Sequence, residues 1–130
     1  MNNVVVNPKT DKHYYQWAKP QRRVRIYLGD HLLADSTDPM LVKEVGHDIY
    51  DGVYYLPKSD VDLAHLAVMM DKTTHCPIKG DSTYYRFEQG GDITEAVAWS
   101  YDAPIMGEEV LSERMAFDAA QVKQVIEPTA

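Results

Sequence analysis

Residues 73–85, with the sequence TTHCPIKGDSTYY, place hydroxyl, imidazole, thiol, ammonium and phenol groups within one short segment. Proline at the second of the four positions that begin at Cys76 is typical of a β-turn, and Ile78 favours type I because type II requires a positive φ there. Such a turn holds its end Cα atoms within about 7 Å, so the Lys79 ammonium can approach the Cys76 thiol. A nearby ammonium favours the thiolate and lowers the thiol pKa. The segment therefore predicts a nucleophilic or redox-active Cys76 with Lys79 as its cationic partner.

Two interpretations of the thiol are open at this point. A free cysteine is among the residue types most often buried, so Cys76 can equally be a small packing residue. His75 is not expected to act on it, because adjacent residues of an extended chain point to opposite faces. A packing turn needs only proline and glycine, so the density of polar groups favours a ligand site. Its expected binding residues are Thr74, His75, Gly80, Tyr84, Trp99 and Tyr101.

Three hairpin patterns are expected to position this segment. In residues 22–36, apolar side chains at every second position precede a Gly29-Asp30 turn. This alternation, followed by a two-residue glycine turn, is typical of a half-buried strand that enters a hairpin. The pattern recurs at residues 49–57 around Asp51-Gly52 and at residues 82–101 around Gly90-Gly91.

Helical signals are few. Residues 59–70 begin with a Ser-x-x-Asp capping pattern, and residues 107–117 have acidic residues early and Arg114 late. Both arrangements suit a helix start and its dipole, so they predict one or two short helices. Because strand patterns outnumber them, we expect a mainly β fold, in which one compact domain consists of antiparallel strands and hairpins.

The composition limits the partners that the chain can have. With 130 residues, 45% apolar residues and no long apolar run, it has the size and balance of one soluble domain without a membrane segment. The formal charge of −7 argues against a nucleic-acid partner. The single cysteine excludes an internal disulfide and a thiolate zinc cage, and we expect neither a metal ion nor a cofactor. The first residues lack a secretory signal, so the expected location is cytoplasmic.

Several motifs carry a resemblance to a known family. The block TTHCPIKGDSTYY, the later AVAWSYDAP and the earlier RRVRIYLGDHLLADS and VYYLPKSDV together resemble the bacterial and fungal domain-of-unknown-function family 427. The resemblance runs from about Trp17 almost to the end, which predicts an N-terminal extension at residues 1–16 and a single domain at residues 17–130. It implies a β-tent-like architecture, related to folds that often hold zinc with four cysteines, a set that this chain lacks. The matching motif positions are Thr74, Cys76, Pro77, Lys79, Gly80, Tyr84, Trp99, Tyr101 and Pro104.

Three functional hypotheses follow, and they leave open whether the protein is an enzyme. The first is a site for a small, anionic ligand around the Thr-x-Cys-Pro-x-Lys-Gly turn, in which Cys76 and Lys79 are the candidate catalytic residues. The second is a non-catalytic interaction module that acts through a protein partner or as a homodimer. The third follows the nucleotidyltransferase label that the resembled family sometimes bears. Asp60 and Asp62 have the spacing of a magnesium pair, but no Gly-Ser phosphate turn precedes them, and acidic residues are ordinary at a helix start.

Overall fold

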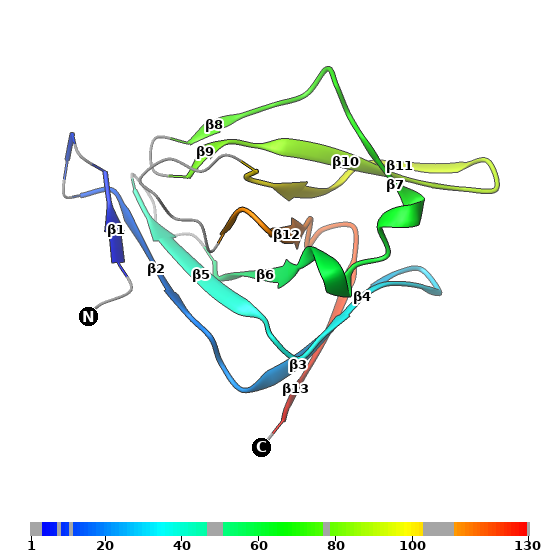
Figure 1. The fold of residues 1–130 in the computed structure, drawn as a ribbon, viewed down its shortest axis with the longest axis horizontal. Helices are drawn as coiled ribbons and strands as arrows, with labels where there is room; N and C mark the ends of the chain where they lie inside the picture. Colours follow the sequence, from blue (N-terminus) through cyan, green and yellow to red (C-terminus); the bar gives the residue numbers. More distant parts are fainter. Residues whose placement is uncertain are drawn as a thin grey trace.

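The computed structural model describes residues 4–7, 9–10, 12–46, 51–76, 79–102 and 111–129. These residues form antiparallel sheets with only short helical turns, so the predicted mainly β fold is confirmed (Figure 1). No helix among the described residues is long and apolar enough to span a membrane.

The largest element is a sheet of eight strands, each antiparallel to its neighbours. Figure 1 shows that it curls, so that its first strands and its last strands form two walls that face each other. In spatial order the strands are β1 (Val4–Val6), β2 (Tyr14–Ala18), β5 (Met40–Val45), β6 (Val53–Pro57), β12 (Arg114–Phe117), β11 (Asp92–Ser100), β10 (Thr83–Gln89) and β7 (Leu66–Val68).

Two smaller sheets complete the fold. In the three-stranded sheet, β3 (Arg22–Leu28) lies between β13 (Lys123–Pro128) and β4 (His31–Ser36). The β3–β4 pair is the first predicted hairpin, with Gly29 at φ 57°, a value that glycine adopts without strain. The two-stranded sheet joins β8 (His75–Cys76) to β9 (Gly80–Asp81).

The other two hairpin predictions have different outcomes. Strands β10 and β11 pair around Gly90 and Gly91, both at positive φ, as predicted. Strand β6 pairs with β5, but the connection includes residues 47–50, which lie outside the described part of the chain. The turn predicted at Asp51-Gly52 therefore stays a prediction.

Of the two ranges expected to be helical, one contains short helical turns, and the described end of the other is a strand. Residues 59–70 contain most of the 3₁₀ turn η1 (Lys58–Asp60), all of the 3₁₀ turn η2 (Leu63–His65) and then strand β7. Within residues 107–117 the described end is strand β12, while residues 107–110 lie outside the described part. All four residues of β12 are buried, because this strand is central and both of its faces are covered. Burial on both faces removes the alternation by which a strand is recognised.

The two faces of the large sheet carry separate cores. One face packs against the three-stranded sheet, and the other lines the inside of the curl. Neighbouring residues divide between them: Leu56 and Met115 belong to the first core, whereas Tyr55 and Ala116 belong to the second. This division follows from the period of two in a strand. The second core reaches the candidate site.

Candidate functional site

A cavity of about 370 Å³ opens on the inner side of the curled sheet. Four of its nine lining residues are aromatic, and two of them, Tyr55 of β6 and Trp99 of β11, point away from the first core. Tyr84 of β10 pairs with Trp99 across the strands, and the centroids of the two rings are 6.4 Å apart. The lining residues are Val53, Tyr55, Lys72, Lys79, Tyr84, Ala96, Trp99, Tyr101 and Asp118.

Lys79 supplies a buried positive charge to this cavity. Its exposed fraction is only 8%, and its Nζ lies 2.8 Å from Oε1 of Glu44 and 5.4 Å from the centre of the Tyr101 ring. Burial by itself lowers the pKa of Lys79, but the phenols of Tyr55 and Tyr101 and the Glu44 carboxylate outweigh burial, so the pKa ends above its ordinary value. The side chain is therefore an ammonium at neutral pH and not a free amine nucleophile.

Glu44 holds the ammonium from the opposite wall of the curl. It lies on β5 at the second position after Val42 and the fourth after Met40, so it shares the face that those two buried residues present to the second core. Partial burial raises the pKa of Glu44. Hydrogen bonds and charges from Lys79 and His13 lower it by more than burial raises it, so the pKa lies below its usual value. The pair is ionised and close to neutral as a unit.

His13 completes this network on the side away from the cavity. The amide of Asn7 donates to His13 Nδ1 at 3.1 Å, which leaves the proton on Nε2. That nitrogen donates to Glu44 Oε2 at 3.0 Å. Glu44 therefore receives one donor on each oxygen, which holds the carboxylate plane and the position of the Lys79 ammonium.

Two phenols adjoin the ammonium. Burial raises the pKa of Tyr101 and of Tyr55, so both hydroxyls keep their protons at neutral pH. The indole N–H of Trp99 donates to the Tyr55 hydroxyl at 3.3 Å and fixes one wall. Lys72 places its ammonium 4.9 Å from the centre of the Tyr84 ring, within the range of a cation–π contact. The cavity thus combines aromatic side chains with hydrogen-bond donors and one carboxylate, that of Asp118.

Four of the residues singled out from the sequence lie together here: Lys79, Tyr84, Trp99 and Tyr101 line one cavity. Cys76 lies beside it, half-buried and packed against the second core. Its sulfur lies within 4.8 Å of a ring nitrogen of His13 and a carboxylate oxygen of Glu44. The salt-bridge partner of Lys79 within the described residues is Glu44. A catalytic role for Cys76 stays a prediction, and the predicted turn falls on residues 77 and 78, which lie outside the described part.

The remaining predicted residues surround the β8–β9 hairpin. His75 is exposed, and its Nδ1 lies 2.7 Å from Oδ1 of Asp81, whereas its neighbour Cys76 packs inward. The Thr74 hydroxyl is 2.7 Å from that of Ser82 and 3.2 Å from that of Tyr84. Ligand contacts for both residues stay predictions.

Gly80 is buried with φ 100°, a backbone conformation that other residues rarely adopt. It pairs with Cys76 across the hairpin and directly follows Lys79. The glycine therefore lets the chain turn where the ammonium enters the cavity, while a direct ligand contact stays a prediction.

Sequence reasoning missed several residues of the site, among them His13, Glu44, Tyr55, Lys72 and Asp118. The signal for Glu44 was available, because an acid in phase with Met40 and Val42 on a strand indicates a carboxylate on the apolar face. The Asp60 and Asp62 pair, in contrast, does not form one site. Asp60 accepts from Ser36, whereas Asp62 accepts from His31, five positions earlier on β4.

Comparison with known proteins identifies a family. Among curated proteins, none matches the sequence significantly. The family described as a domain of unknown function (DUF427) matches residues 16–128, a span that includes every residue of the aromatic cavity. The chain therefore belongs to the DUF427 family.

Proposed function

We propose that the protein binds a small, planar, anionic molecule in the aromatic cavity, with Lys79 as the group that recognises its negative charge. The observation that carries this proposal is the buried Lys79 ammonium on the wall of a cavity of about 370 Å³. That volume lies within the range of about 300–1,000 Å³ that is usual for small-molecule sites.

The aromatic walls support a planar ligand. Tyr84 and Trp99 pack against each other at the cavity, and Tyr55 and Tyr101 lie nearby with their ring centres 6.4 Å apart. Aromatic faces favour offset stacking or edge contacts with a second ring. A flat molecule with a delocalised ring therefore suits this cavity.

The charge of the ligand follows from the Lys79–Glu44 pair. An ammonium has three N–H donors, and Glu44 accepts one of them. A carboxylate or phosphate oxygen in the cavity would accept another, and a hydrogen bond between two charged groups is stronger than one between neutral groups. Because Lys79 stays protonated, it contributes charge and hydrogen bonds and does not attack the ligand as an amine.

The test is binding of benzoate compared with benzamide, its neutral analogue of similar shape. The readout is Trp99 fluorescence in a Trp17→Phe background, together with the melting temperature. We expect benzoate to bind more tightly than benzamide. The double variant Lys79→Met/Glu44→Gln should abolish that preference, and Glu44→Gln alone should strengthen it, because the competing carboxylate is gone.

Lys19→Met, at an exposed lysine away from the cavity lining, is the matched control and should leave both affinities unchanged. Equal binding of benzoate and benzamide, or a preference that survives the double variant, would contradict the role of Lys79. If no aromatic acid quenches Trp99, the proposal as a whole is wrong.

A second candidate, self-association, rests on the outer edge of the large sheet. Strand β1 is the last strand on its side, and Val4 and Val6 are exposed there. An open edge with apolar side chains is suited to pairing with another strand. Light scattering tests this candidate independently of any ligand.

A further inference from the structure

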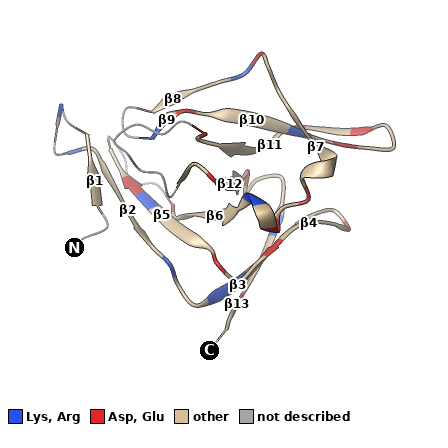
Figure 2. Ribbon diagram, in the orientation of Figure 1, with Lys and Arg blue, Asp and Glu red and all other residues tan. Residues whose placement is uncertain are grey.

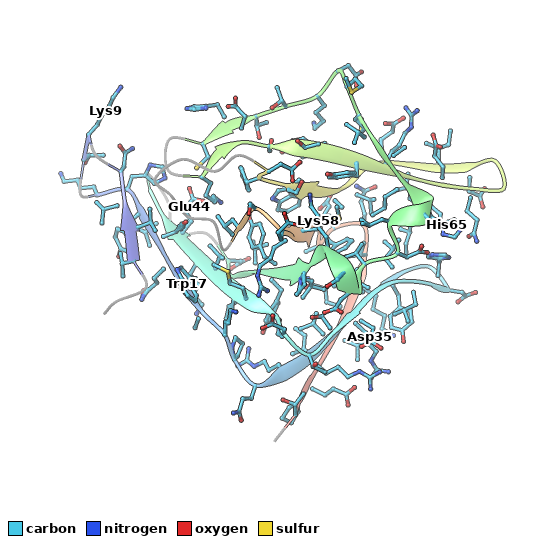
Figure 3. The ribbon with its side chains drawn as sticks, in the orientation of Figure 1. Lys9, Trp17, Asp35, Glu44, Lys58 and His65 are labelled. Atoms are coloured by element: carbon cyan, nitrogen blue, oxygen red, sulfur yellow. The ribbon has the colours of Figure 1, made fainter. Side chains whose placement is uncertain are left out.

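Three side chains with metal-binding atoms meet at the side of the fold opposite the aromatic cavity: His31, Asp62 and His65. Figure 3 shows His65 on the far side of the molecule from Glu44. Nε2 of His31 and Nδ1 of His65 each lie 2.7 Å from the same oxygen, Oδ2 of Asp62. All three atoms lie within 4.8 Å of one another.

The backbone holds Asp62 in this position. Its N–H donates to the carbonyl of Leu33 on β4 at 2.8 Å, and the residue before it, Val61, bridges to Ala34. The carboxylate is therefore fixed relative to β4, the strand that begins with His31. Strand β4 therefore positions two of the three side chains: His31 directly, and Asp62 through the backbone contacts of Val61 and Asp62 with this strand.

The 3₁₀ turn η2 supplies the third group. Its residues Leu63–His65 follow Asp62 directly, so Asp62 and His65 are three positions apart. Side chains with this spacing eclipse each other in a 3₁₀ turn. The short turn, which replaces the longer helix expected from the sequence, thus brings the His65 imidazole to the carboxylate.

Phe87 of β10 limits the movement of both imidazoles. Its ring centre lies 5.0 Å from that of His31 in an edge contact and 6.0 Å from that of His65 in a stacked contact. The two imidazole centres are 4.8 Å apart at an angle of 73°. Both rings are half-buried, so they are partly ordered by packing before any ligand binds.

We propose that His31, Asp62 and His65 bind a divalent transition-metal ion of the zinc type, with the remaining coordination positions open to water. Two imidazoles and one carboxylate are a donor set that suits such ions. Bonds of about 2.0–2.1 Å in tetrahedral geometry place the donor atoms about 3.3 Å apart. On metal binding, the nitrogen–oxygen distances would lengthen slightly from 2.7 Å. The distance between the two imidazole nitrogens, now at most 4.8 Å, would adjust to a similar value.

The proton positions allow this change without a new charge on the protein. A carboxylate only accepts hydrogen bonds, so each imidazole now donates from the nitrogen that faces Asp62. Moving each proton to the other ring nitrogen leaves a lone pair toward the ion. The ion then takes the place of the two protons between the three side chains.

The approach to the site is acidic. A cavity of about 490 Å³ opens beside His31 and Phe87, and Asp30 and Asp92 lie on its walls. Among the described residues that line it, none is a lysine or an arginine. Figure 2 shows acidic residues at the tips of the β3–β4 and β10–β11 hairpins, which flank this region. A cation therefore meets negative charge on its way to the imidazoles.

A second group of donor atoms, from His13, Glu44 and Cys76, is less suitable. Its atoms also lie within 4.8 Å of one another, but the Lys79 ammonium is 2.8 Å from Glu44. A divalent cation there would be placed against an existing positive charge. The proposal therefore concerns the His31 site, and it departs from the sequence-based expectation of no metal ion.

The test is calorimetric titration of tag-free, chelator-treated protein with Zn²⁺ alone, and with Co²⁺ for its visible d–d absorption. We expect one equivalent to bind, with nitrogen ligands evident in the Co²⁺ spectrum. His65→Gln and Asp62→Asn should each weaken Zn²⁺ binding by about 100-fold or more, because loss of an outer supporting group already costs about 10–100-fold. Asp62→Asn keeps an oxygen that can accept both hydrogen bonds but removes the charge.

The matched control is His75→Gln, which disrupts another hydrogen-bonded His–Asp pair, this one exposed and with a single imidazole. It should leave the affinity unchanged, and so should Cys76→Ser. No binding of either ion, or binding that His65→Gln leaves intact, would overturn the proposal. His31, Asp62 and His65 would then form a hydrogen-bonded group without a metal-binding role. Loss of binding in Cys76→Ser would also overturn it and would place the ion at the second group. Circular dichroism of each variant verifies that the fold is retained.

Discussion

Replacing Lys79 by methionine removes the ammonium that lies 2.8 Å from Glu44 across the curl. The Glu44 carboxylate would then keep the hydrogen bond from His13, in a position where its side chain is only 20% exposed. Breaking a buried ion pair from one side costs about 3–5 kcal/mol, because the remaining charge is unpaired. Glu44 keeps some contact with water, so we expect a loss of about 3 kcal/mol in the free energy of unfolding.

Glu44→Gln should cost about 2–3 kcal/mol, because the ammonium loses its carboxylate but keeps the phenol groups beside it. The double variant Lys79→Met/Glu44→Gln should be far milder, at about 0–1 kcal/mol, since it removes both charges together. The double-mutant cycle should therefore give a coupling energy of at least about 2 kcal/mol.

The assay is urea unfolding followed by tryptophan fluorescence, supported by melting temperatures. For a chain of this length, a loss of about 3 kcal/mol lowers the melting temperature by about 10 °C. Lys19→Met is the matched control, because the Lys19–Asp38 pair has side chains 49% and 55% exposed and should contribute about 0–1 kcal/mol. Single variants that lose less than about 1 kcal/mol, or a double variant that loses the sum of both, would refute the reasoning.

Three further predictions follow from the same contacts. The folded pKa of Glu44 lies below its ordinary value, set by Lys79 and His13 with Tyr55 and Cys76 nearby. Its ionisation therefore stabilises the fold above the unfolded pKa, and this contribution is lost as the pH falls through the folded pKa. Between about pH 6 and pH 3, the free energy of unfolding should fall less in Lys79→Met/Glu44→Gln than in the native protein. Iodoacetamide should modify Cys76 faster in Glu44→Gln, because a negative charge near the sulfur opposes the thiolate, and more slowly in Lys79→Met. Identical rates in the native protein and both variants would show that neither charge acts on the sulfur. The native chain should be a homodimer in light scattering, and Val6→Lys on β1 should dissociate it, whereas a monomer at every concentration tested would end that prediction.

The parts of the fold that could be predicted are those written in short-range patterns. In β3, alternation between buried and partly buried positions, followed by a glycine at positive φ, specifies the hairpin with β4 within one segment. The same holds for β10 and β11 around Gly90 and Gly91. Strand β12 lacks such a pattern, because its four residues are buried and both of its faces are covered, and the acidic residues earlier in the range 107–117 resembled the start of a helix.

The candidate site was predicted in part. Lys79, Tyr84, Trp99 and Tyr101 were singled out from their residue types and family motif, and they line one cavity. Tyr84 and Trp99 lie on β10 and β11, which pair locally, and Lys79 and Tyr101 lie a few residues outside these strands, so neighbouring motifs meet at one place. Glu44, which neutralises Lys79, comes from β5, and nothing in the segment around Lys79 indicates that partner.

The sequence by itself determined the class of the fold, its local hairpins and the set of side chains able to do chemistry, because strand alternation and turn residues act over a few positions. The tertiary structure alone decided which of those side chains meet. The curl of the large sheet places Glu44 against Lys79, and the return of the chain along β4 places Asp62 between His31 and His65. These contacts depend on sheet order and on the packing of segments far apart in the chain, and periodicity within one segment carries no information about either.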